Sequence, residues 1–310
     1  MTTISVSMVK KLRESSGAGM MDCKQALTES CGDINNALDI LRKKGLSKAA
    51  KKSTRIAAEG LIGVSANGKS GSLVEVNAET DFVARNVLFQ DMVRAISCLG
   101  IDANGDIDRL LSTPYPGKSL SVEDNIKEAI ATIGENITLR RCAVLHVENG
   151  LVADYIHNKA ADQLGKIGVL VALESSGNPE KLGEFGRQLA MHIAASAPLA
   201  LSVDELDAEV ISKEKAIYYD QAKQSGKPDE IIEKMVQGRL RKEFFQQVVL
   251  PQQTFVMDGK ASVEQAIKTA EKDVGASIKV TGFFRYELGD GILREEDNFA
   301  AEVAAAAGAS

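Results

Sequence analysis

The sequence contains no tryptophan, only three histidines and four cysteines, and no long apolar run. No segment approaches the roughly 20 apolar residues that span a bilayer, and the first ten residues lack the apolar core of a secretory signal. The cysteines form no C-x-x-C pair and have no histidine at zinc-ligand spacing. We therefore expect a cytoplasmic protein without a membrane segment, with reduced cysteines and no bound metal.

Motifs of covalent chemistry are also missing. There is no G-x-x-x-x-G-K-S/T phosphate loop, no G-x-S-x-G elbow and no H-E-x-x-H zinc motif. His192 follows Ala190 and Met191 on a helix that is otherwise apolar. Such a histidine is more often packed or interfacial than a general base, although a nucleophile brought near it by the fold stays an alternative. The sequence predicts no cofactor and no enzymatic activity.

The charge balance is acidic, with 37 basic and 43 acidic side chains and a net charge of −6. Domains whose main partner is bulk nucleic acid usually carry a large basic excess, so no direct nucleic-acid binding is expected. Positive charge is concentrated in one short stretch, at Lys43, Lys44, Lys48, Lys51, Lys52 and Arg55. A solvated linker is the simpler interpretation of this basic cluster, and nucleic-acid binding is the alternative.

The fold class that the sequence predicts is α+β. Helical spacing of apolar residues over about 1–44 indicates a compact three-helix unit, with Asp33 as the N-cap of the third helix and Gly45 as its C-terminal glycine. The basic linker extends this unit to residue 55. The alanine-rich end predicts a short helix near 298–306, within a C-terminal module over 291–310.

Two related α+β lobes are expected in the middle of the chain. The first, over 56–136, has a hairpin at Asn67-Gly68 and then a helix that carries Val87 and Leu88 on its apolar face. The second begins with 137–204, where a strand leads into another turn at Asn149-Gly150, and is completed by 250–290.

An antiparallel helical hairpin is predicted over 205–249, inserted in the second lobe. Two amphipathic helices flank the turn Ser225-Gly226-Lys227-Pro228. Such an arm suits contact with a partner or with a second copy of the chain. A buttress packed against the core is the alternative.

Several ordered motifs closely resemble the elongation factor Ts family. Residues 12–27, LRESSGAGMMDCKQAL, resemble its N-terminal signature, and residues 75–84, EVNAETDFVA, resemble its core signature. Residues 189–195, LAMHIAA, are similar to the matching helix of the second lobe. Supporting matches occur at 133–137, 225–228 and 299–303, so the resemblance runs in order over nearly the whole chain.

The resemblance implies a non-enzymatic guanine-nucleotide exchange factor of translation elongation, whose partner is elongation factor Tu. It also implies an N-terminal ubiquitin-associated-like module and an arm, over 205–249, that forms a coiled-coil homodimer. The family's core motif falls on Thr80, Asp81, Phe82 and Val83, which by resemblance disturb the Mg²⁺ site of Tu so that GDP leaves and GTP can bind.

The residue types of this motif suit that role, because Phe82 offers a rigid apolar wedge and Asp81 brings negative charge toward a metal site. The alternative is that Thr80 or Asp81 caps a helix beginning near Phe82, which then packs inward. The resemblance further implies Leu12, with Met20 or Met21, and His192 as contacts with Tu. The alternative for both methionines is core packing of the small helical module.

Overall fold

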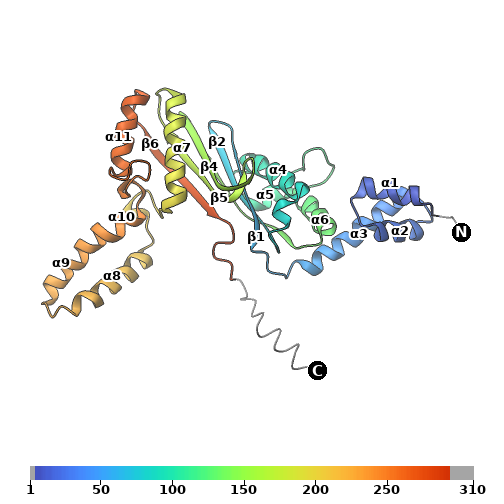
Figure 1. Cartoon of the computed structure of the whole chain (residues 1–310), viewed down its shortest axis with the longest axis horizontal. Helices are drawn as coiled ribbons and strands as arrows, with labels where there is room; N and C mark the ends of the chain where they lie inside the picture. The colour runs from blue at the N-terminus through green and yellow to red at the C-terminus, as the bar shows by residue number, and fades with distance from the viewer. Residues whose placement is uncertain (1–3, 294–310) are drawn as a thin grey trace.

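The structure is a computed structural model, and it describes residues 4–293 apart from the side chains of Leu46 and Lys48. It joins helices to an antiparallel sheet, so the predicted α+β class is confirmed. Three bodies are visible along its length: a small helical module, a central sheet with covering helices, and a projecting helical pair (Figure 1). The helix expected over 298–306 lies outside the described residues. None of the described helices combines the length and apolarity that a membrane span needs.

The N-terminal module consists of three helices around a core of its own. Their bounds are α1 Val6–Ser16, α2 Met20–Glu29 and α3 Ile34–Lys52. The Asp33 carboxylate accepts a hydrogen bond from the Asn36 N–H at 3.0 Å, so the predicted N-cap of the third helix is confirmed.

Gly45 does not end the third helix, and that prediction is wrong. The helix α3 continues seven residues further, to Lys52. A Cβ placed on Gly45 would lie only 3.0 Å from the Cβ of Ala131 in α6, Val122–Ile133. The glycine therefore permits α3 and α6 to approach closely. The basic stretch that follows it, up to Lys52, is part of the same helix.

One six-stranded sheet runs through the centre of the molecule, with every paired strand antiparallel. Its path is β3-β2-β1-β5-β4, and β6 pairs with β5. The strands are β1 Glu59–Ala66, β2 Ser70–Ala78, β3 Ile137–His146, β4 Gly150–Ala161, β5 Leu164–Glu174 and β6 Lys279–Glu287. The hairpin predicted at Asn67-Gly68 joins β1 to β2 and is confirmed.

The turn predicted at Asn149-Gly150 lies between β3 and β4, which are not neighbours in the sheet. β3 pairs with β2, whereas β4 turns back on β5 at Asp162 and Gln163. Gly150 sits at the start of β4 with φ +151°, where a side chain would strike the backbone of Leu173. The turn-like sequence therefore marks a close approach of two strands.

The two halves of the sheet repeat one order of elements. β1, β2, α4 (Val87–Ala103), α6 and β3 correspond to β4, β5, α7 (Pro179–Ser196), α11 (Val263–Val274) and β6. The N-caps Ser121 and Ser262 start the corresponding helices α6 and α11. The second lobe was expected to begin at residue 137, where β3 starts, but β3 pairs with β2 of the first lobe. The bounds 1–55, 56–136, 137–204, 205–249, 250–290 and 291–310 stay predictions.

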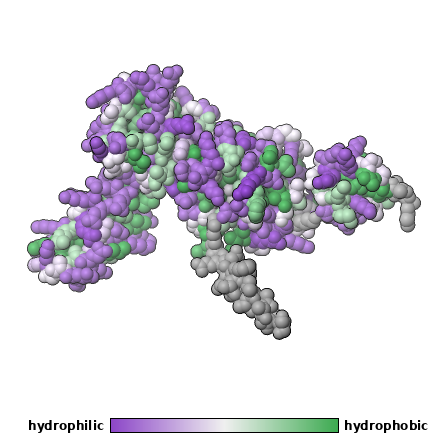
Figure 2. All heavy atoms as spheres, in the orientation of Figure 1, coloured by the Kyte–Doolittle hydropathy of each residue, from purple (hydrophilic) through white to green (hydrophobic). Residues whose placement is uncertain are grey.

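A helical hairpin projects from the body between α7 and α11 (Figure 1). It consists of α8 Ala208–Lys223 and α9 Asp229–Arg239, followed by a π-helical turn, Leu240–Phe244, and α10 Phe245–Val248. Tyr218 and Val236 belong to a core of this hairpin's own, and Arg239 stacks on Tyr218 at 4.2 Å. Hydrophobic residues gather along its middle (Figure 2). The buttress alternative is therefore wrong.

Four short helices lie between the longer helices and strands. They are η1 Val83–Arg85, α5 Ile107–Ser112, η2 Val203–Glu205 and η4 Leu250–Gln252. The helices α4 and α6 contribute to one buried cluster over the first half of the sheet, and α7 and α11 contribute to another over the second half. This packing places the segment between β2 and α4 at an end of the sheet.

Candidate partner-binding surface

The segment after β2 is held firmly on both sides of two projecting residues. Thr80 donates its N–H and its hydroxyl to the carboxylate of Glu135, at 2.8 and 2.6 Å. Val83 and Ala84 are buried in the core of the first half. Between these anchors Asp81 is exposed, and Phe82 leaves 74% of its surface exposed. We call Asp81 and Phe82 the tip.

Neither Thr80 nor Asp81 caps the following helix. α4 begins at Val87, and Asn86 is its N-cap, accepting the N–H of Leu88 at 2.9 Å. The single turn η1 intervenes. Since Phe82 points into solvent, the alternative in which it packs inward is wrong. The Asp81 carboxylate lies 3.8 Å from the guanidinium of Arg85, both at the surface.

Val87 and Leu88 correct another prediction. Their spacing predicts that both lie on the buried face of the helix, but they leave 66% and 64% of their surfaces exposed. Burial begins one residue later, at Phe89. Helical periodicity identified the apolar stripe, but it does not show that the first turn of α4 extends beyond the sheet. With Phe82, three large apolar side chains are thus exposed within seven residues.

A second exposed apolar pair lies on the N-terminal module. Met20 and Met21 leave 49% and 74% of their surfaces exposed, so the core-packing alternative is wrong for both. Leu12 has no exposed surface and belongs to the module's core. The structure therefore contradicts a direct contact by Leu12, because its side chain already fills that core.

The helix α6 lies beneath both the tip and the methionine pair. Gly17, just before the two methionines, lies against Thr132 near the end of α6. Glu135, which binds Thr80, follows that end by two residues. The position of the methionine pair relative to the tip is therefore set through α6.

His192 is fully buried, which contradicts a direct contact with a partner. Its Nε2 lies 2.9 Å from Oε1 of Gln253, and the N–H of Val256 donates to its Nδ1 at 3.3 Å. The Gln253 amide nitrogen donates to backbone carbonyls, so its oxygen accepts and His192 carries its proton on Nε2. Burial lowers the pKa of His192, and the Gln253 hydrogen bond opposes that effect.

This environment also disfavours a catalytic role for the imidazole. Every hydrogen-bond partner that the described residues give His192 is an amide or the hydroxyl of Ser196. The ring of Phe255 packs on it at 5.6 Å between centroids. His192 instead fixes α7 to the segment that returns from the arm.

Comparison with known proteins decides the family. The sequence model described as Elongation factor TS matches residues 79–290. Proteins named Elongation factor Ts from Bartonella quintana (strain Toulouse) and Bartonella tribocorum (strain CIP 105476 / IBS 506) are 57% and 58% identical to this chain. Both alignments cover 98% of this chain and 99% of the relative. The chain belongs to the elongation factor Ts family. A third member, from Parvibaculum lavamentivorans, is 56% identical, and its alignment covers 99% of both chains.

In this member of the elongation factor Ts family, several cations of the basic cluster are engaged within the chain. Lys44 pairs with Glu29 at 2.7 Å, and Arg55 pairs with Glu79 at 3.2 Å. Lys52 donates to the carbonyl of Gly134. The contacts of Arg55 and Lys52 attach the helical module to the core, whereas the Lys44–Glu29 pair joins α3 to α2 within the module. All three disfavour the nucleic-acid alternative, which needs such charges free for phosphates.

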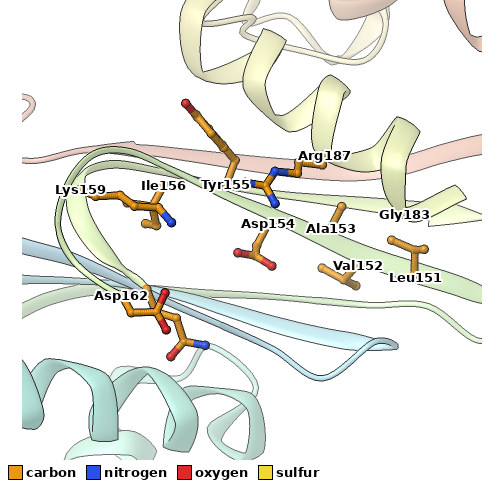
Figure 3. A pocket seen from close by; sticks show the side chains of 11 residues that line it. Leu151, Val152, Ala153, Asp154, Tyr155, Ile156, Lys159, Asp162, Gly183 and Arg187 are labelled. Atoms are coloured by element: carbon orange, nitrogen blue, oxygen red, sulfur yellow. The ribbon is translucent and has the colours of Figure 1, made fainter. Parts of the chain in front are cut away.

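A hollow lies over β4, and none of the predicted site residues lines it. Its volume is about 450 Å³, and Asp154, Lys159, Asp162 and Arg187 line it with the neighbouring strand residues (Figure 3). Partial burial raises the pKa of Asp154, and the charges of Arg187 and Lys159 oppose that rise.

Within residues 4–293 no group of three or more histidine, cysteine or acidic side chains could hold a metal ion.

Proposed function

We propose that this chain is a guanine-nucleotide exchange factor for elongation factor Tu, acting through the Asp81–Phe82 tip and without enzymatic chemistry of its own. The observation that carries this proposal is an exposed aromatic residue and an exposed carboxylate between two fixed anchors. An exposed large apolar residue on a fixed support suits insertion into a partner's pocket. Membership of the elongation factor Ts family supplies the partner.

The mechanism is differential binding. Phe82 enters the GTPase as a wedge, while Asp81 brings a negative charge toward the phosphate and Mg²⁺ region that holds GDP. Because coupling between two ligands is reciprocal, the factor weakens GDP binding by the same amount that GDP weakens binding of the factor. A tenfold loosening of GDP requires about 1.4 kcal/mol of differential binding.

The other predicted residues divide into two roles. Met20 and Met21 provide a second contact from the ubiquitin-associated-like module, since flexible thioethers adapt to a partner's groove. Thr80 and Val83 hold the tip in place. Leu12 and His192 act indirectly, as core residues that shape the surfaces above them.

The arm over 205–249 is the site of the proposed homodimer. Ile217 on α8 and Ile231 on α9 leave 50% and 47% of their surfaces exposed, which gives a second copy apolar area to cover. Sedimentation equilibrium tests this: the parent should dimerise, and Ile217→Glu with Ile231→Glu should be monomeric. A monomeric parent at micromolar concentration would exclude the dimer.

Release of fluorescent GDP from Tu tests the exchange function. We expect catalytic amounts of the chain to accelerate release, and Asp81→Ala with Phe82→Ala to lose most of the acceleration while remaining folded. Asp102→Ala with Leu199→Ala is the matched control, because it removes an exposed carboxylate and an exposed apolar side chain elsewhere. A double tip variant as active as the parent would refute the wedge.

The cytoplasmic location follows from this function and is part of the proposal.

A further inference from the structure

The ladder between β2 and β3 stops just before the tip. Its last pair is Ala78 opposite Ile137. In the same antiparallel register, Glu79 would face Asn136 and Thr80 would face Glu135. The chain therefore leaves the sheet at the residues that lead into Asp81 and Phe82.

Side-chain carboxylates continue the pairing beyond that point. The Asn136 N–H donates to Oε1 of Glu79 at 2.6 Å, and the Thr80 N–H donates to Oε2 of Glu135 at 2.8 Å. Each strand end thus contributes one carboxylate and one amide to the other. We call Glu79, Thr80, Glu135 and Asn136 the clasp. Hydrogen bonds to an ionised acceptor are shorter and stronger than the backbone bonds they replace here.

Glu135 binds more of the tip's base than a ladder pair would. It accepts the Thr80 hydroxyl at 2.6 Å as well as the N–H, so both donors of Thr80 meet one carboxylate. This fixes the backbone direction with which the chain enters Asp81. Because Val83 and Ala84 are buried on the other side, the two projecting residues have little freedom of their own.

The clasp also receives the end of the N-terminal module. Arg55 pairs with Glu79, and the Asn136 side-chain amide donates to the carbonyl of Arg55 at 2.8 Å. Lys52 binds the carbonyl of Gly134, directly before Glu135. The linker from the helical module is therefore attached to Glu79 and Asn136 of the clasp, and the other two clasp residues hold the base of the tip.

We propose that Glu135 is a positioning residue of nucleotide exchange: it holds Thr80 so that Phe82 projects in the orientation that enters the partner. The inference rests on the proposed function, and it assigns the segment 133–137 a role that its resemblance to the family left open. Glu135 itself touches no nucleotide and acts through Phe82. A purely structural role would instead lower stability without depending on Phe82.

The experiment compares full-length variants in GDP release from Tu over a range of factor concentrations. Glu135→Ala removes both acceptors, and Glu135→Gln keeps one amide oxygen for Thr80. Glu128→Ala is the control, since Glu128 lies on α6 and its carboxylate pairs with Lys118 at 3.2 Å, outside the clasp. Thermal melting and amide hydrogen exchange over 79–84 are measured on the same samples.

We expect Glu135→Ala to lower the release rate at saturating factor about tenfold, equivalent to about 1.4 kcal/mol. Glu135→Gln should fall between this variant and the parent, and Glu128→Ala should match the parent. Amide exchange over 79–84 should accelerate in Glu135→Ala. In a Phe82→Ala background the same substitution should change the rate less than twofold, because the residue through which it acts is gone.

Two results would overturn the proposal: release within twofold of the parent for Glu135→Ala, or an equal loss with and without Phe82. A parent that fails to accelerate release refutes the proposed exchange function and the role of Glu135 in it. Amide exchange then decides separately whether Glu135 holds the tip, since unchanged protection over 79–84 would refute that as well.

Discussion

Phe82 leaves 74% of its surface exposed, whereas the next residue, Val83, leaves only 3%. We therefore predict opposite effects for two neighbouring substitutions. Phe82→Ala should change the free energy of unfolding by less than about 0.5 kcal/mol and yet impair GDP release. Val83→Ala should lower that free energy by about 2 kcal/mol, because buried methyl groups are lost. Urea unfolding and the release assay measure both; a strongly destabilised Phe82→Ala would mean that the ring packs inward.

Val87 and Leu88 extend the apolar surface beyond the tip. Val87→Ser with Leu88→Ser should slow GDP release by about threefold to tenfold, since two apolar contacts worth about 1 kcal/mol in total would be lost. The melting temperature should stay close to that of the parent, because both side chains are exposed. Leu199→Ser, at a residue that is 60% exposed near the arm, serves as the comparison. Equal release rates for all three proteins would exclude this surface.

His192 should make stability depend on pH. Burial lowers its pKa below the usual 6.5, so the unfolded chain binds more protons than the folded one as the pH falls through 6.5. The contribution of His192 to stability is therefore complete above this pH and is lost progressively below it. One such group gives a slope of at most about 1.36 kcal/mol per pH unit. Urea unfolding between pH 7.5 and 5.5 measures it.

A histidine control separates this effect from general acid destabilisation. His192→Leu should be less stable at pH 7.5, because it leaves Gln253 and the Val256 N–H without their partner, but it should have a flatter pH profile. His157→Gln, at an exposed position, should keep the parent's slope. A slope that survives in His192→Leu would assign the pH dependence to other groups.

Glu75 should be among the costliest side chains of the sheet to remove. It is fully buried, and its carboxylate contacts Arg140 at 3.2 Å and Arg141 at 2.5 Å. It also accepts the N–H of Gly289, which ties β2 to the chain beyond β6. Glu75→Ala should lower the free energy of unfolding by about 3 kcal/mol, because two arginines lose their counter-ion. In urea unfolding the exposed control Glu148→Ala should stay within about 0.5 kcal/mol of the parent, and a loss below 1 kcal/mol for Glu75→Ala would contradict the prediction.

Local signals predicted much of the architecture. The Asp33 cap and the Asn67-Gly68 hairpin depend on residues close together in the sequence, and the structure contains both. The paired helices around Ser225-Gly226 follow from the same kind of pattern. Motifs that occur in the family's order over nearly the whole chain were enough to indicate the family.

Long-range contacts decided the features that local signals missed. Gly45 looks like a helix cap but is needed for the approach of α6, and Gly150, which was predicted only as part of a turn, is also needed for the close approach of β5. Glu135 could be placed near Thr80 only through the pairing of β3 with β2.

The sequence by itself determined the three-helix unit, the paired helices of the arm, the first hairpin and the family, because capping, periodicity and motif order are properties of neighbouring residues. Only the tertiary structure decided which apolar residues face outward. It buried Leu12 and His192 and exposed Phe82, Val87 and Met21, although all five belong to similar-looking apolar or motif segments. The physical reason is that burial depends on which distant elements cover a side chain. The role proposed for the tip depends on this, because the fold covers Val83 and leaves Phe82 uncovered.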